Sequence, residues 1–248
     1  MNNKATAILF GYALSSFASY CYAQNTPLLE YVAQYEASAN GLEATATRSL
    51  NRTDENSYRL SNSLEASIAG QALANLDQAS EFIIDGGRIV PLNYSYQLSG
   101  VSRASHTIFF NWDGEVALST EGDESWQLQL KEGVMDQLSY QVAIRQALMD
   151  NTEDETSFSF EIIDGDAIEI QEYRLVGEEI TSTPLGELST LKLEQVREAS
   201  DERVTEIWLA LEWDFLLTRI EQLNSSGLRI SLKLKSAKLD GNTIRGNN

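Results

Sequence analysis

The sequence has very few of the residues on which most metal and cofactor sites depend. Its 248 residues include one cysteine and one histidine. One cysteine excludes a disulfide scaffold and a cysteine-rich zinc site, and a single histidine excludes most histidine-based metal sites. The chain also has no G-x-S-x-G elbow, no phosphate-binding glycine loop and no H-E-x-x-H pair. We therefore expect no cofactor, and the residues favour a protein that is not an enzyme.

Basic residues are scarce as well. There are 18 Lys and Arg against 37 Asp and Glu, which gives a formal net charge of −19. Nucleic-acid binding needs clustered basic side chains, so we expect no nucleic-acid partner. The acidic excess fits the polar faces and loops of an exported domain, and it disfavours electrostatic docking on anionic membranes.

The amino terminus differs from the rest of the chain. Lys4 is followed by an apolar run from Ala5 to Phe17, and the segment closes with Cys21-Tyr22-Ala23. This pattern predicts a signal peptide over residues 1–23, cleaved after Ala23, and therefore a periplasmic protein. A membrane anchor is the alternative, but the run is shorter than the roughly 20 residues that span a bilayer. No later stretch is long and apolar enough to cross a membrane, so we expect no transmembrane segment in the mature chain.

Alternation of apolar and polar residues dominates the remaining sequence, residues 24–248. Such alternation predicts antiparallel strands with one buried face and one solvated face. Asp-Gly pairs at 85–86, 113–114 and 164–165 lie between β-forming segments and predict hairpin turns. The clearest alternating runs are Tyr31–Ala37, Tyr58–Ile68, Leu92–Leu98, His106–Trp112, Trp126–Leu130, Phe158–Ile162 and Ile230–Leu234.

One segment breaks this pattern. Apolar residues at helical spacing between Val134 and Met149 predict a helix over about 134–149. A shorter and ambiguous helical pattern covers Ala69–Ala79. No linker or shift in composition divides the chain, so we predict a single β-rich domain of roughly ten to twelve strands. The fold class is mainly all-β: an antiparallel, open or incomplete barrel, or curved sheet, with one packed helix.

Aromatic residues in the alternating strands are the candidate binding residues. Large strand aromatics ordinarily fill a β core; the sharper hypothesis is a concave apolar cavity for a lipid-like ligand. The residues proposed for such a ligand are Tyr94, Tyr96, Phe110, Trp112, Trp126 and Trp208. His106 shares a face with Ile108 and Phe110, which favours a half-buried strand histidine over a general base.

Three carboxylates surround the third Asp-Gly turn: Asp164, Asp166 and Glu169. Their spacing is not that of an EF-hand loop, and acidic turns are usually solvated. They are weak metal candidates, and we predict no metal site. They are also the best candidates for a carboxylate-dependent hydrolase.

The landmarks together resemble the bacterial domain-of-unknown-function family 3108. The ordered segments are EYVAQYEASANGLEA, FIIDGGRIVPLNYSYQLSG, WDG, GVMDQLSYQVAIRQAL, TPLGELSTLKLEQV and IWLALEWDFLLTRIEQLNSSGLRISLKLKSAKL. The resemblance implies an exported, β-rich envelope protein and supplies no catalytic residues.

Three functional hypotheses follow from the sequence. The first is a non-enzymatic envelope protein that binds an apolar, lipid-like ligand. The second is an envelope assembly or protein-interaction module, because exposed strand edges can accept a partner strand. The third is the hydrolase.

Overall fold

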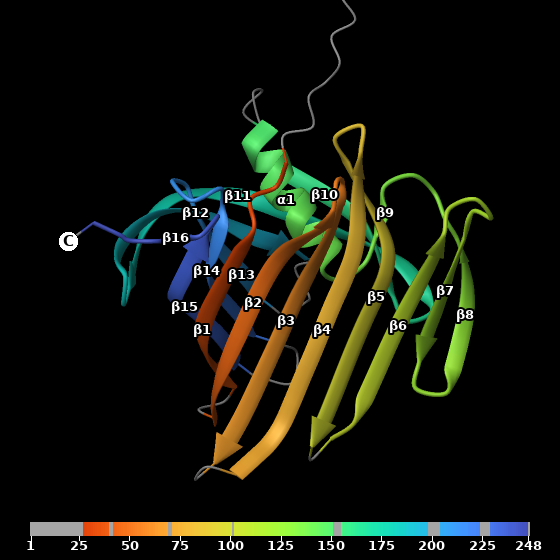
Figure 1. The fold of residues 1–248 in the computed structure, drawn as a ribbon, viewed down its shortest axis with the longest axis horizontal. Helices are drawn as coiled ribbons and strands as arrows, with labels where there is room; N and C mark the ends of the chain where they lie inside the picture. The colour runs from red at the N-terminus through yellow and green to blue at the C-terminus, as the bar shows by residue number, and fades with distance from the viewer. Residues whose placement is uncertain are drawn as a thin grey trace, which may run out of the picture.

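A computed structural model describes residues 27–39, 42–68, 71–100, 102–150, 155–197, 204–223 and 229–247. The predicted signal peptide and its cleavage site lie outside the described residues. Within these ranges the chain forms long strands and one α-helix (Figure 1). No helix in the described part is long and apolar enough to cross a membrane.

The strands come in two groups separated by the helix. The first group is β1 (Tyr31–Ala39), β2 (Leu42–Asp54), β3 (Ser57–Ile68), β4 (Gln71–Asp85), β5 (Arg88–Gly100), β6 (Ala104–Asn111), β7 (Val116–Glu121), β8 (Glu124–Gln129) and β9 (Val134–Met135). Helix α1 (Ser139–Asp150) follows. The second group is β10 (Ser157–Asp164), β11 (Ala167–Thr183), β12 (Gly186–Val196), β13 (Val204–Ala210), β14 (Leu216–Leu223), β15 (Arg229–Leu239) and β16 (Asn242–Thr243).

All described strands belong to one sheet that does not close. Its order is β8-β7-β6-β5-β4-β3-β2-β1-β15-β14-β13-β12-β11-β10-β9, with β16 paired to β15. The β1–β15 pair joins the two ends of the chain, from Tyr31 opposite Leu239 to Ala39 opposite Ile230. The sheet curves into two facing layers: β1–β6 lie toward the viewer in Figure 1, β7 and β8 continue this layer at the right, and β10–β12 run behind it. The expected open, mainly β architecture with one helix is confirmed.

Two features of the sheet differ from expectation. The described part has 16 strands rather than ten to twelve, and 14 remain when the two-residue strands β9 and β16 are left out. The sheet is also mixed, since β9 pairs with β10 in parallel through Val134–Glu161 and Met135–Ile162. A two-residue pair of this kind leaves no alternating pattern in the sequence.

The predicted hairpins form at all three Asp-Gly positions. In the first, the turn residues Gly86 and Gly87 both have positive φ, 57° and 84°, as the tight connection between β4 and β5 requires. In the third, Gly165 alone provides the positive φ. The second is a longer turn in which Glu115, with φ of 53°, precedes β7.

The helix begins later than its apolar spacing predicted. Val134 and Met135 form β9, and the expected helix over 134–149 is therefore wrong at its start. Asp136 ends the strand and caps the helix: its Oδ1 accepts hydrogen bonds from the backbone N–H groups of Leu138 and Ser139, and Ser139 Oγ accepts from the Asp136 N–H. This reciprocal arrangement satisfies backbone donors that a helix start leaves without partners.

The ambiguous helical pattern over residues 69–79 is also wrong where the structure describes it. Residues 71–79 lie in β4, which pairs with β3 from Gln71 onward and with β5 from Ala74 onward. Pairing on both sides overrides the helix propensity of this alanine- and leucine-rich segment.

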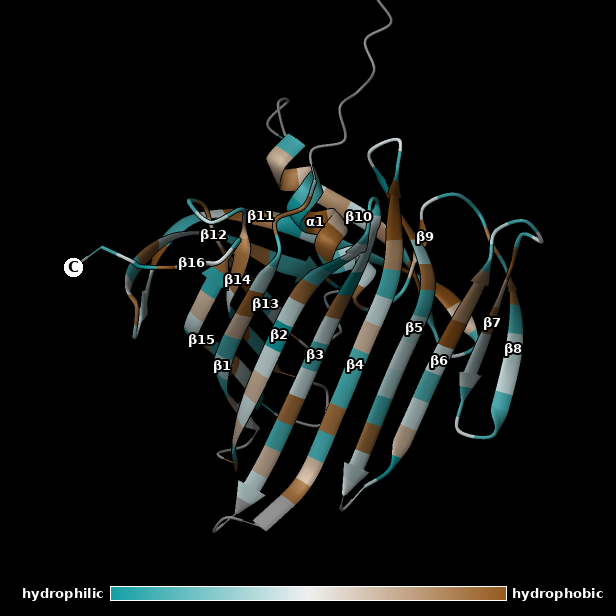
Figure 2. Cartoon of the chain, in the orientation of Figure 1, coloured by the Kyte–Doolittle hydropathy of each residue, from teal (hydrophilic) through white to brown (hydrophobic). Residues whose placement is uncertain are grey.

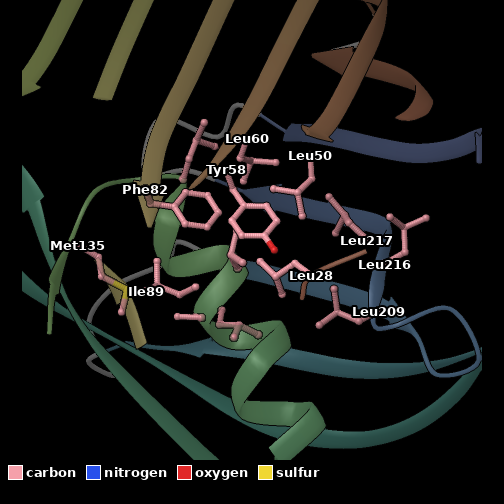
Figure 3. Close-up of a cluster of buried hydrophobic side chains, with 14 of the residues drawn as sticks. Leu28, Leu50, Tyr58, Leu60, Phe82, Ile89, Met135, Leu209, Leu216 and Leu217 are labelled. Atoms are coloured by element: carbon pink, nitrogen blue, oxygen red, sulfur yellow. The ribbon is translucent and has the colours of Figure 1, made fainter. Parts of the chain in front are cut away.

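The core fills most of the space between the two layers. Alternating apolar and polar bands run along β2–β6 (Figure 2). Leu50, Tyr58 and Phe82 of one layer point toward α1 and toward Leu209 and Leu217 of the other (Figure 3). Tyr58 and Phe82 stack with ring centroids 5.8 Å apart. A hydrogen bond also crosses the layers, from Tyr35 Oη to the carbonyl of Leu217 at 3.0 Å.

Candidate ligand-binding site

Most of the predicted aromatic residues gather on one face of the sheet. Tyr94 and Tyr96 of β5, Phe110 of β6, Trp112 just after it, and Trp126 of β8 all follow the inward alternation of their strands. Phe110 stacks on Trp112 with centroids 5.9 Å apart, and the Trp112 indole donates to the Pro91 carbonyl at 2.7 Å. Tyr94 and Phe110 are almost fully buried, so these two act as core packing.

Trp208 is not part of this group. It lies on the face of β13 opposite to Ile207 and Leu209, which belong to the core. Its ring lies between two cations, with Lys192 Nζ 4.9 Å and Arg219 Cζ 4.5 Å from the centroid. Its indole nitrogen donates to Glu179 Oε2 at 2.8 Å. These contacts describe a tryptophan held by cation–π and polar interactions.

The single histidine contacts a serine that links two parts of the sheet. His106 Nε2 is 2.9 Å from Ser119 Oγ, which in turn donates to the carbonyl of Gly165 at 2.6 Å. The serine proton therefore points to a carbonyl rather than to the imidazole, which does not suit a serine nucleophile. Burial lowers the pKa of His106, and the carboxylates of Glu121 and Asp164 partly oppose this shift.

The acidic candidates Asp164, Asp166 and Glu169 are all exposed around the β10–β11 turn. Asp164 Oδ1 accepts a hydrogen bond from Gln137 Nε2 at 2.7 Å. Within the described ranges no three His, Cys, Asp or Glu side chains come together in a group that could hold a metal ion.

A surface pocket of about 680 Å³ lies beside α1 and the β4–β5 turn. Trp112, Ile89, Leu130, Met135 and Ala143 give it an apolar floor, and charged residues of the turns and of 131–132 form its rim. Trp112 is the predicted ligand residue that lines it.

A second cavity, of about 220 Å³, lies between the two layers and beneath α1. None of the aromatic residues predicted to bind a ligand lines it. Its lining comes from β1, β2, β4, the turn before α1, α1 itself, β13 and β14. The residues are Tyr31, Arg48, Gln78, Gln137, Tyr140, Gln141, Ile144, Arg145, Thr205, Ile207, Leu209, Leu217, Ile220 and Gln222. At this place the side chains of the two layers and of α1 do not fill the space between them.

Two buried arginines that line this cavity were not predicted from the sequence. Arg48 of β2 and Arg145 of α1 are only 7% and 4% exposed. Arg48 Nε donates to Tyr31 Oη at 2.9 Å and its Nη1 to Gln141 Oε1 at 2.7 Å. A signal existed for Arg48, because it occupies the inward parity of its strand together with Ala46 and Leu50.

These observations define the class of structure: an unclosed, β-barrel-like sheet that encloses a cavity capped by a helix. The sequence model of the family described as "Protein of unknown function (DUF3108)" matches residues 34–233. The chain therefore belongs to the DUF3108 family, as its ordered segments predicted. No functionally curated protein matches the chain.

A solved structure shares the fold at very low sequence identity. A crystal structure of a β-barrel-like protein of the domain of unknown function DUF1849 from Brucella abortus matches with a TM-score of 0.55 and 8% identity, over 86% of this chain and 98% of that one. An exported-protein candidate with a YmcC-like fold from Bacteroides fragilis matches with a TM-score of 0.37 and 11% identity, over 84% and 95% of the two chains. The likeness to the Brucella abortus protein concerns the fold alone.

Proposed function

We propose that this chain is an exported, non-enzymatic envelope protein that binds an apolar, lipid-like ligand inside its unclosed barrel. The observation that carries the proposal is the cavity between the layers. Ile144, Ile207, Leu209, Leu217 and Ile220 give it apolar walls on the sides of α1, β13 and β14. Ligand sites are concave and combine apolar surface with placed polar groups. Here the five apolar residues line the cavity together with nine polar or charged ones, so the cavity suits a ligand that has both an apolar and a polar part.

Export is part of the proposal and rests on the sequence of residues 1–23. We propose that the mature protein begins at Gln24, resides in the periplasm and folds as one domain over residues 24–248. Amino-terminal sequencing of the protein recovered from the periplasmic fraction tests the cleavage site. A full-length amino terminus in the cytoplasmic fraction would contradict this part.

Ligand binding is tested with the mature protein and an apolar fluorescent probe, together with native mass spectrometry of protein purified from its own periplasm. Thr205 lines the cavity while its neighbour Val204 faces outward and is 39% exposed. Thr205→Phe should therefore reduce probe uptake, and Val204→Phe is the matched control that should not. Absence of any co-purified lipid and of any probe uptake by the wild type would overturn the proposal.

A second candidate, the interaction module, is favoured by the free edge of β8. This strand ends the sheet on one side, and unpaired edge strands can accept a strand from another protein. Phe109 and Leu118, which pair across β6 and β7 close to this edge, are 56% and 45% exposed. Crosslinking in cells that recovers only the monomer would count against this candidate.

A further inference from the structure

The two arginines of the internal cavity approach it from different elements. Arg48 comes from β2, within one layer of the sheet, and Arg145 comes from the helix above. Arg145 Nε donates to the carbonyl of Asp214 at 2.9 Å, and its Cζ lies 5.1 Å from the centroid of the Tyr31 ring. Arg48 donates to Tyr31 and Gln141, so both guanidinium groups border the same space.

Arg145 retains donors that no atom of the described residues accepts. Its Nη1 and Nη2 are buried and have no hydrogen-bond partner in the described part of the chain. The hydroxyl oxygen of Thr205, which lines the same cavity, is also buried without a partner. A guanidinium group stays protonated even when it is buried, and a buried charge is unfavourable unless it is paired.

Among the described residues no acidic side chain forms an ion pair with Arg145, although the chain is rich in acids. Burial lowers the pKa of Arg145, and the carboxylate of Asp214 raises it only from a distance. The chain has 37 acidic side chains against 18 basic ones, and several cations elsewhere have acidic partners, such as Arg174 with Glu194 and Lys192 with Glu206. Among the described residues that line the cavity there is no aspartate or glutamate. The carboxylate of the nearby Asp136 already accepts hydrogen bonds from Ser80, Leu138 and Ser139. The cavity therefore combines a positive end with apolar walls.

We infer that the cavity binds the oxyanion group of an amphiphilic ligand, a carboxylate or a phosphate, at Arg145 and Arg48. The fork of N–H groups on a guanidinium matches the two oxygens of such a group, and the Thr205 hydroxyl provides a further donor. The apolar walls formed by Ile207, Leu217 and Ile220 contact the adjoining hydrocarbon. The inference rests on the proposed function and names the chemical class of the ligand. At about 220 Å³ the cavity takes the anionic group and the first part of a chain, not a whole lipid.

The test compares ligands that differ only in the head group. Binding of dodecanoate, dodecanol and inorganic phosphate to the mature protein is measured by calorimetry at pH 8, where a carboxyl group is ionised. We expect dodecanoate to bind at least about ten-fold more tightly than dodecanol, because only the acid supplies a negatively charged partner for the arginines. Arg145→Met should remove this preference and leave dodecanol binding unchanged. Arg174→Met is the matched control, since it removes a positive charge that is 61% exposed outside the cavity.

The binding results distinguish the anion site from the proposed apolar-ligand function. Equal affinity for dodecanoate and dodecanol would overturn the anion site while leaving the proposed apolar-ligand function intact. Binding of neither compound would remove both. Phosphate that binds as tightly as dodecanoate, and depends on Arg145, would support the anion site but overturn the amphiphile as its source. The head-group comparison on the wild type decides the matter even if the Arg145 variant fails to fold.

Discussion

Replacing Arg145 with methionine should leave the unliganded protein nearly as stable as the wild type. The substitution removes the hydrogen bond from Nε to the Asp214 carbonyl, which contributes about 1.5–3 kcal/mol for a charged donor. It also removes the cation–π contact with Tyr31, which contributes about 1–2 kcal/mol when desolvated. Against these losses, methionine eliminates the desolvation cost of a guanidinium that is 4% exposed, which is several kcal/mol.

These opposing contributions are of similar size, and methionine and arginine have similar helix propensities. We therefore expect the free energy of unfolding of Arg145→Met to lie within about 2 kcal/mol of the wild-type value. Urea unfolding followed by tryptophan fluorescence measures this difference. Leu148→Ala is the control on the same helix: Leu148 is a core residue, and its truncation should cost about 2–5 kcal/mol.

The result that would refute this reasoning is a large loss of stability. If Arg145 neutralised a buried acid, its removal would leave that acid without a partner and cost about 3–5 kcal/mol. At about 2–4 °C per kcal/mol for a domain of this size, the melting temperature would fall by about 6 °C or more. Arg145 would then be a structural residue rather than a group that awaits a ligand.

Three further predictions concern single polar groups. His106 is the only histidine, so its imidazole titration is directly assignable by NMR, and burial should place its pKa below the ordinary value of about 6.5. Because the unfolded chain then binds more protons, stability should fall as the pH drops from about 6.5 toward that lowered pKa; a His106→Asn variant that loses stability just as steeply would contradict this. Thr205→Val removes a buried hydroxyl without a partner and should be neutral or stabilising by about 1 kcal/mol in urea unfolding; a loss of more than about 1 kcal/mol would mean that the hydroxyl has a partner. Asp136→Ala removes the cap of α1 and should cost about 1–2 kcal/mol, with Asp136→Asn costing less because its amide oxygen can still accept; equal losses for the two variants would exclude the capping role.

The local elements of the fold were largely readable from the sequence. Period-two alternation and the Asp-Gly turns predicted the strands and hairpins, because each depends on residues close in sequence. The start of α1 was missed because Val134 and Met135 satisfy a helical spacing but pair with β10 instead. The pattern over 69–79 was misread for the same reason: its strand state depends on neighbours on both sides.

The candidate site was less predictable, because it depends on how distant elements meet. Trp208 follows the same alternation as the other aromatics, and nothing local shows that it points away from the core. The arginine pair arises because the β1–β15 pairing and the curvature of the open sheet bring β2, α1 and β13 around one space. The one sign of the candidate site in the sequence was Arg48, a charged residue at an inward-facing position of an otherwise apolar strand face.

A crystal structure of the mature protein with bound dodecanoate tests the central claim most directly. The account predicts a carboxylate within hydrogen-bonding distance of Arg145 Nη1 and Nη2, with the chain extending along Ile207, Leu217 and Ile220. Density for the ligand only in the surface pocket beside Trp112, or only on the outer face of the sheet, would contradict the account.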